Sequence, residues 1–200
     1  PEFHRDVLES LRQPIESGKV HIARAKQSLS LPAKFTLIAA MNPCPCGYYG
    51  DEEKACRCGA HEILRYQKKV SGPLLDRIDL QIYVPRVAVA NLRAPRESSN
   101  ETEEMRARVH EAREIQRERL APYKGKFTNA ELSSKECDEL IRLDPSADQF
   151  LKTVLEKSFL SARGYYRILK TAQTIADLEA APTVTKDHLA EAFGYRLRES

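Results

Sequence analysis

Residues 44–47 read Cys44-Pro45-Cys46-Gly47, and the same spacing returns at Cys56-Arg57-Cys58-Gly59. Four of the five cysteines of the chain thus lie within fifteen positions. Zn²⁺ prefers four tetrahedral ligands, and two C-x-C arms supply them if the backbone turns sharply at the glycine after each arm. The sequence therefore predicts a structural zinc held by the thiolates of Cys44, Cys46, Cys56 and Cys58, with no open position for water.

Other states of these cysteines stay open at the level of sequence. The C-x-C spacing is less specific than the usual C-x2-4-C arm of a zinc site. A disulfide within one arm would close a small, strained ring, whereas a bridge between the arms is geometrically possible, as are free thiols. His61 follows closely and could replace one cysteine. Cys137 has no neighbouring cysteine and is expected to be a small buried hydrophobe.

The composition excludes a chain saturated with positive charge. Its 32 Lys and Arg residues nearly balance 29 Asp and Glu residues, which gives a net charge of +3. Any contact with DNA must therefore be local. No apolar run approaches the roughly eighteen residues of a membrane span, and the first residues lack the layout of a signal peptide. We expect a cytoplasmic protein without membrane contact.

The first part of the chain, 1–86, reads as α/β. It begins within a helical pattern, which suggests a piece of something longer, and Pro14 is expected to close that helix. Residues 20–31 are typical of a hairpin. Two further strands are expected at Phe35–Met41, whose continuous apolar run is typical of a parallel sheet, and at Leu80–Val84. A helix is expected at Glu62–Val70, broken by Ser71-Gly72-Pro73.

The second part is expected to be all-α. A linker over 87–100 separates it from the first part, because that stretch contains Pro95 and ends in polar residues. Residues 101–200 then show helical patterns, of which the first is strongly charged with interleaved signs. The expected helices are Glu101–Leu120, Ser133–Leu143, Ser146–Ser158, Ser161–Glu179 and Lys186–Tyr195, with Ser161 and Thr185 as N-caps.

Four motifs in a fixed order carry a family resemblance. They are Pro1-Glu2-Phe3, A-A-M-N-P-C-P-C-G from Ala39, S-G-P-L-L-D-R-I-D-L from Ser71 and S-A-R-G-Y-Y-R-I-L-K from Ser161. Together they resemble the magnesium-chelatase-like AAA+ ATPases, and among these the ComM/YifB competence family, over nearly the whole chain. The resemblance implies the C-terminal half of an AAA+ P-loop α/β core, with a β-hairpin and a four-cysteine insertion, followed by a helical lid domain.

The resemblance also implies a longer parent protein. In the family, the P-E-F motif directly follows the acidic residues of Walker B, and the P-loop lies further upstream. No G-x-x-x-x-G-K-[ST] occurs in residues 1–200, so this stretch lacks the cradle for ATP phosphates. The intact protein is expected to use ATP and Mg²⁺, whereas these residues alone are expected to be inactive.

Two residues of the first part match nucleotide-facing positions of the family. Asn42 matches sensor 1, at the carboxyl end of a core strand, where ligands of open α/β sheets bind; by itself it is an asparagine that starts a turn. Arg77 resembles the arginine finger, which reaches the nucleotide of a neighbouring subunit. An ion pair with Asp76 or Asp79 is the structural alternative for Arg77.

The second part and the hairpin add further family positions. Arg163 matches the sensor 2 arginine near a helix N-terminus, and Arg167, four residues on, is the runner-up. A solvated arginine is the alternative for either. The hairpin corresponds to the pre-sensor-1 hairpin, so that Arg24 and Lys26 could track a DNA backbone. An ordinary solvated turn explains these two cations equally well.

The implied function is that of a ring motor. We expect part of a hexameric AAA+ ATPase that acts as a DNA translocase or branch-migration helicase in natural transformation or recombination. A magnesium-chelatase motor subunit is the first alternative, although the resemblance gives that subunit no four-cysteine insertion. A zinc-stabilised interaction module without catalytic activity is the second. DNA-stimulated ATP hydrolysis would separate the first reading from the other two.

Overall fold

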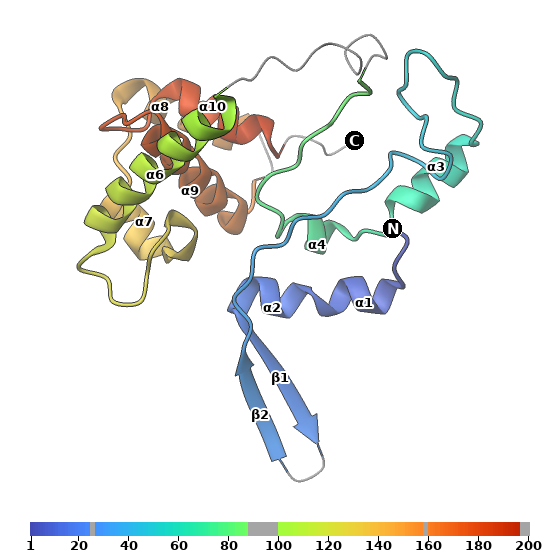
Figure 1. Cartoon of the computed structure of the whole chain (residues 1–200), viewed down its shortest axis with the longest axis horizontal. Coiled ribbons are helices and arrows are strands. Elements are labelled where there is room, and N and C mark those ends of the chain that lie inside the picture. The colour runs from blue at the N-terminus through green and yellow to red at the C-terminus, as the bar shows by residue number, and fades with distance from the viewer. Residues whose placement is uncertain (25–26, 88–99, 158–159, 197–200) are drawn as a thin grey trace. The chain divides into compact units, whose positions relative to one another are not determined.

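The computed structural model describes residues 1–24, 27–87, 100–157 and 160–196 (Figure 1). The chain divides into two compact units. The N-terminal unit consists of residues 1–78 and 83–87, and the helical unit contains residues 79–82 together with the described part of 88–200. Apart from Val87 and Asn100, the predicted linker over 87–100 lies outside the described residues.

Two short helices open the N-terminal unit. They are α1 (Arg5–Ser10) and α2 (Arg12–Ser17), and Leu11 separates the two helices. Pro14 does not close a helix, contrary to the prediction. It lies in the first turn of α2, where a missing backbone N–H leaves no hydrogen bond unmade. Gly18 ends α2 with a left-handed φ of 63°, which glycine adopts without strain.

The predicted hairpin is confirmed. Strands β1 (Lys19–Arg24) and β2 (Gln27–Pro32) pair antiparallel, from Lys19 opposite Pro32 to Arg24 opposite Gln27. The N–H of Ala33 donates to the carbonyl of Gly18 at 2.7 Å and closes the base of the hairpin. Figure 1 shows the hairpin extending away from α1 and α2, which explains why all of β2 is exposed.

The other two predicted strands are wrong. Neither Phe35–Met41 nor Leu80–Val84 joins a sheet, and β1–β2 is the one sheet among the described residues. Their apolar side chains are open to solvent, with Ile38 91% and Ile82 67% exposed. A β-strand needs a neighbour to bind its backbone groups, and no described segment supplies one here. The described residues therefore contain no parallel sheet.

Two helices follow the cysteine-rich loop. Helix α3 (Ala60–Gln67) confirms the predicted helix in this region and buries Ile63 and Tyr66. Ser71-Gly72-Pro73 does more than break it, because Ser71 caps a new short helix, α4 (Gly72–Leu75). Its hydroxyl accepts a hydrogen bond from the N–H of Leu74, and proline is tolerated in a first turn.

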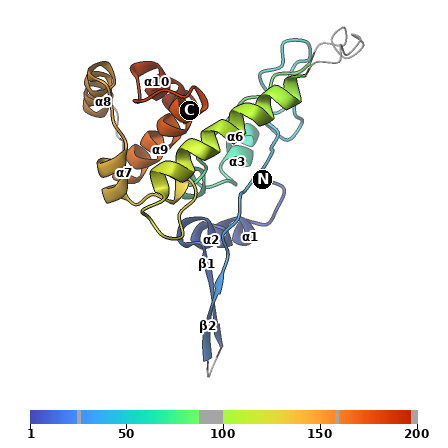
Figure 2. The ribbon, with the colours of Figure 1, turned by 60° about the vertical axis from the view of Figure 1, so that its left-hand side comes forward.

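The helical unit confirms the predicted all-α character. Its elements are α6 (Glu101–Leu120), the 3₁₀ turn η1 (Asn129–Glu131), α7 (Ser134–Leu140), α8 (Pro145–Lys157), α9 (Ala162–Leu178) and α10 (Lys186–Gly194). The hydroxyls of Ser161 and Thr185 cap α9 and α10, as predicted. Figures 1 and 2 show α6 beside α9, the helix that contributes most to the buried core. That core also contains Cys137, which is fully buried as expected.

A buried carboxylate fixes α6, η1 and α9 to one another. The side chain of Asp177 on α9 is fully buried and pairs with Arg119 of α6. It also accepts hydrogen bonds from the amides of Asn129 (2.8 Å), Gln173 (2.9 Å) and Gln116 (3.2 Å). Because every one of these polar groups has a partner, the network specifies how the three elements pack.

Candidate functional site

The four predicted zinc ligands lie together in the N-terminal unit. The sulfur atoms of Cys44, Cys46, Cys56 and Cys58 are all within 4.8 Å of one another. Cys44 Sγ lies 3.4 Å from Cys46 Sγ and 3.7 Å from Cys56 Sγ, and the last two sulfurs are 3.6 Å apart. No disulfide joins them. His61 is outside this group and exposed on α3.

These separations fit a tetrahedral metal centre. With a Zn–S bond of about 2.3 Å, two sulfur atoms at neighbouring corners of a tetrahedron are about 3.8 Å apart. The measured separations lie close to that value, whereas a disulfide needs about 2.05 Å. Four cysteine sulfur atoms gathered around one point form a donor set that suits Zn²⁺ held by protein alone.

One of the two glycines supplies the expected sharp turn. Gly47 has φ of 84°, and its N–H donates to the carbonyl of Cys44 at 3.0 Å. This turn folds the first arm so that both of its sulfurs face the same point. Gly59 is different, because its φ is −67° and it caps the N-terminus of α3. The prediction of a sharp turn at the glycine after each arm is therefore correct for Gly47 and wrong for Gly59.

The electrostatics of the cluster favour a bound cation. Hydrogen bonds from the backbone N–H groups of Arg57 and Tyr48 lower the pKa of the Cys46 thiol to about 6. Burial is the main cause that raises the pKa of Cys58 to about 12. The Cys46 thiol thus forms a thiolate near neutral pH, while the raised pKa values of Cys56 and Cys58 oppose further negative charge beside it. A divalent cation removes that repulsion, and its binding displaces the remaining protons.

Asn42 lies just before the cluster. It is exposed, and its Cγ is 4.0 Å from the position that a Cβ on Gly47 would take. The segment before Asn42 is not a strand in the described chain, as shown above. Its match to sensor 1 therefore stays a prediction.

Arg77 is held by a residue that the sequence pattern did not indicate. Its Nε donates to Glu16 Oε2 at 3.0 Å, a second guanidinium nitrogen contacts the same oxygen, and a third donates to the carbonyl of Pro73. The Arg77 side chain is only 10% exposed. An ion pair thus joins Arg77 to Glu16 of α2. Sequence reasoning missed Glu16 because it is 61 positions away.

The two arginines of α9 differ in their surroundings. Arg163 lies in the first turn of the helix and is exposed. Arg167, one turn further, is 16% exposed at its side chain and donates to Asp79 Oδ1 at 2.5 Å, within the helical unit. Arg163 therefore has the position near the helix N-terminus that suits an anion, and Arg167 lies one turn further along the helix.

Of the predicted hairpin cations, Arg24 ends β1 opposite Gln27, and Lys26 lies outside the described residues. The structure thus brings the four cysteines together, and it places Arg24 at the far end of the hairpin.

Among the described residues, no helix is both long enough and apolar enough to cross a lipid bilayer.

Two family descriptions match the chain one after the other. "Magnesium chelatase, subunit ChlI" matches residues 1–92, and "Magnesium chelatase, subunit ChlI C-terminal" matches residues 99–196. The chain is also 44% identical to the competence protein ComM of Haemophilus influenzae over 196 residues. The chain belongs to the magnesium-chelatase-like ComM/YifB family. YifB of Salmonella typhimurium and YifB of Escherichia coli are each 38% identical over 196 residues.

The matches cover 98% of this chain but 37% of each of the three relatives, so the chain spans little more than a third of their length. The four-cysteine cluster, the hairpin and the helical unit lie within the matched residues.

Proposed function

We propose that this chain forms the C-terminal part of an AAA+ ATPase that moves or remodels DNA. The observation that supports it best is the 44% identity to a competence protein along 98% of the chain. The intact protein would assemble as a ring, hexameric by the family resemblance, and act in the cytoplasm as a translocase or branch-migration helicase during transformation or recombination. Residues outside 1–200 would bind the ATP phosphates and Mg²⁺, because the P-loop sequence does not occur here.

Each predicted site residue has a distinct part in this proposal. Asn42 would orient the attacking water as sensor 1. Arg77 would stabilise charge on the phosphoryl group of a neighbouring subunit, and Arg163 would contact the γ-phosphate in its own subunit. Glu16 now occupies the guanidinium of Arg77. A carboxylate and a phosphate offer similar paired oxygens to arginine, so the finger exchanges one partner for the other when a subunit interface forms.

The proposed zinc would have a structural role. Four protein thiolates fill a tetrahedral coordination sphere, which leaves no position for a reacting water. The metal would then keep the loop between Asn42 and α3 in one shape, since the loop has little secondary structure of its own.

The test is ATP hydrolysis by the full-length protein, with and without single-stranded or branched DNA. DNA should stimulate turnover, and Arg77→Ala should lower it by about 10³-fold or more if Arg77 acts as an arginine finger. Glu16→Gln is the matched control, because it breaks the same ion pair and keeps the guanidinium. Equal losses in both variants would show that Arg77 is structural. An ATP hydrolysis rate that is the same with and without DNA would contradict the proposal of a DNA motor.

Arg163 needs a separate comparison. Arg163→Ala should abolish ATP turnover, whereas Arg167→Ala should have the smaller effect because Arg163 lies closer to the N-terminus of α9, the end that favours an anion. The reverse order would assign sensor 2 to Arg167.

A magnesium-chelatase motor subunit is the second candidate, favoured by the descriptions of the two matching families. It predicts ATP turnover that depends on a metal-insertion partner and not on DNA.

A further inference from the structure

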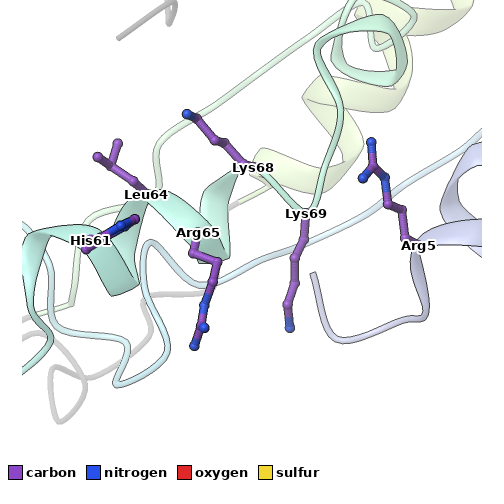
Figure 3. A pocket seen from close by; sticks show the side chains of 6 residues that line it. All are labelled: Arg5, His61, Leu64, Arg65, Lys68 and Lys69. Atoms are coloured by element: carbon purple, nitrogen blue, oxygen red, sulfur yellow. The ribbon is translucent and has the colours of Figure 1, made fainter.

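A pocket of about 370 Å³ in the N-terminal unit is lined almost entirely by basic residues. Its lining consists of Arg5, His61, Leu64, Arg65, Lys68 and Lys69, with no acidic residue among them (Figure 3). Arg5 comes from α1, and the other residues come from α3 and the two positions after it. Apart from His61, a possible metal ligand, these residues belong to neither the predicted zinc site nor the predicted DNA-contacting hairpin.

Helical spacing explains why these residues share a face. His61, Arg65 and Lys69 follow one another at intervals of four, and Leu64 and Lys68 lie beside them, so the five positions form one broad solvent-facing arc of α3 and its C-terminal cap. The opposite side buries Ile63 and Tyr66 against the rest of the unit. The only acidic residue of α3, Glu62, is not part of the lining. The helix thus presents a basic face to solvent.

The charges on this face are not balanced. Several cations elsewhere in the chain contact a carboxylate, as Arg77, Arg119 and Lys126 do. No recorded ion pair among the described residues involves Arg5, Arg65, Lys68 or Lys69, and all four are exposed. Like charges at a spacing of four repel one another on a helix, so this pattern lowers the stability of α3.

The helix dipole accounts for only part of the pattern. Cations at the C-terminal end of a helix interact favourably with its negative end. This interaction explains the positions of Arg65, Lys68 and Lys69 at the end of α3. Arg5 is the first residue of α1, the end where a cation is unfavourable. The Glu9 carboxylate on the same helix offsets part of the charge of Arg5, and an external anion at the pocket would offset the charges of all four cations.

The directions of the side chains identify the kind of anion. Figure 3 shows Arg65 and Lys69 extending to one side of α3 while Lys68 extends to the other. A site for one small phosphate requires donors that converge on it, often with backbone N–H groups. Cations that spread over an exposed face fit a row of phosphates instead, as in binding of a nucleic acid backbone without sequence preference.

We propose that the α3 basic face, formed by Arg5, Arg65, Lys68 and Lys69, binds the phosphate backbone of a nucleic acid at a place separate from the hairpin. The proposal deepens the proposed function, because it assigns a second DNA-contacting surface to the same motor. It places that surface directly after the cysteine cluster, since α3 begins two residues beyond Cys58. The zinc loop then also fixes the start of a DNA-binding helix.

The test is DNA binding by the full-length protein, measured by fluorescence anisotropy on a labelled oligonucleotide, single-stranded and duplex, between about 50 and 200 mM salt. The variant Arg65→Gln/Lys68→Gln/Lys69→Gln should lose about tenfold or more in affinity at the low salt. Its plot of log K against log salt should be flatter by about 2 for single strands and about 3 for duplex DNA, at about 0.7 and 0.9 per lost phosphate contact.

Three controls make the result specific. Arg106→Gln/Arg108→Gln/Lys124→Gln removes the same charge from exposed positions of the helical unit and should leave the slope unchanged. Arg65→Lys/Lys68→Arg/Lys69→Arg keeps the charge and should restore affinity. Inorganic phosphate should displace DNA no better than sodium chloride of equal ionic strength. If it does displace DNA better, the site binds a single phosphate and the inference is wrong.

The possible failures can be told apart. If the wild-type protein binds neither oligonucleotide, the proposed DNA motor and this inference fail together. If the wild-type protein binds with a steep salt dependence and the triple glutamine variant binds equally well, only this inference fails. An equal loss in the control variant of the helical unit would show a general effect of net charge and would also overturn it.

Discussion

Cys44 is the fully buried member of the cysteine cluster, and the other three sulfurs belong to half-buried residues. Cys44 Sγ lies 3.4 and 3.7 Å from two neighbouring sulfur atoms, and its burial hinders solvent from replacing it as a ligand. Loss of the Cys44 sulfur should therefore weaken metal binding more than loss of a hydrogen bond to one of the ligands.

We expect Cys44→Ser to lower zinc affinity by about 100-fold or more, since even loss of an outer hydrogen bond costs about 10- to 100-fold. The measurement is zinc content after dialysis against a competing chelator. Gly59→Ala is the control, because Gly59 has an ordinary φ and no atom near its added Cβ. Full zinc retention by Cys44→Ser would contradict the tetrahedral site.

Glu136 sets an acid limit on the stability of α7. Hydrogen bonds from Lys126 and from the Ser133 side chain lower its pKa from 4.5 to about 2. A lowered pKa stabilises the folded state above the pKa of the unfolded chain, and this contribution is lost as the pH falls from about 4.5 toward 2. We expect Glu136→Gln to flatten that part of the stability curve in denaturant titrations at several pH values.

The matched control for Glu136 is Glu118→Gln, which removes an exposed carboxylate on α6. It should keep the wild-type slope of unfolding free energy against pH. A Glu136→Gln variant with the same slope as the wild type would show that the capping box of Ser133 and Glu136 does not couple folding to pH.

At the level of elements, the end of α9 contains the one left-handed alanine of the described chain. Ala180 has φ of 51°, and the N–H of Ala181 donates to the carbonyl of Ala176 at 2.9 Å. The N–H of Ala180 donates to the carbonyl of Asp177, so the helix ends in a Schellman motif. Glycine is the residue that this position favours, because a Cβ costs about 1 to 2 kcal/mol there.

We expect Ala180→Gly to raise the unfolding free energy of the helical unit by about 0.5 to 1 kcal/mol, after the larger entropy of the unfolded glycine is subtracted. Chemical denaturation followed by circular dichroism measures it. Ala121→Gly should do the opposite, because Ala121 caps α6 with an ordinary helical φ of −50°. The same sign for both substitutions would refute the argument from φ.

Sequence patterns predicted the helices well and two of the strands badly. Periodicity and capping residues such as Ser161 and Thr185 act within a few positions, so they are readable along the chain. The apolar run Phe35–Met41 has strand composition, but a strand also needs a neighbour, and composition does not show where it is. Pro14 was misread because its effect depends on the turn of the helix in which it lies.

The same limit applies to the candidate site. The four cysteines were predictable because all ligands lie within fifteen positions. The partners of Arg77 and Arg167, Glu16 and Asp79, are 61 and 88 positions away, beyond any local pattern. The α3 basic face had a readable local signal in the spacing of Arg65, Lys68 and Lys69, but Arg5 joins it only through the fold.

For the whole molecule, the four-cysteine cluster and the main apolar core belong to different units. All four cysteines of the cluster are in the N-terminal unit, and the core around Ile168 and Leu189 is in the helical unit. Removal of the metal should therefore loosen one unit and spare the other.

We expect a zinc chelator to speed amide hydrogen exchange in residues 42–67 and to leave residues 101–157 and 160–196 unchanged. The physical reason is that the loop around Gly47 has few backbone hydrogen bonds of its own, whereas α6 and α9 share a packed core. Hydrogen-exchange mass spectrometry measures both regions in one sample. Faster exchange throughout the chain would mean that the metal stabilises the units jointly.

The exposed stretch Phe35-Thr36-Leu37-Ile38-Ala39-Ala40-Met41 has a consequence for how the protein behaves in concentrated solution. It is a charge-free run with strong β preference and no proline, the composition of segments that stack into intermolecular sheets. With Phe35 half exposed and Ile38 almost fully so, nothing in the described chain prevents such stacking. Colloidal stability is thus limited by these seven residues, and a single lysine introduced at Ile38 would act as a gatekeeper against aggregation.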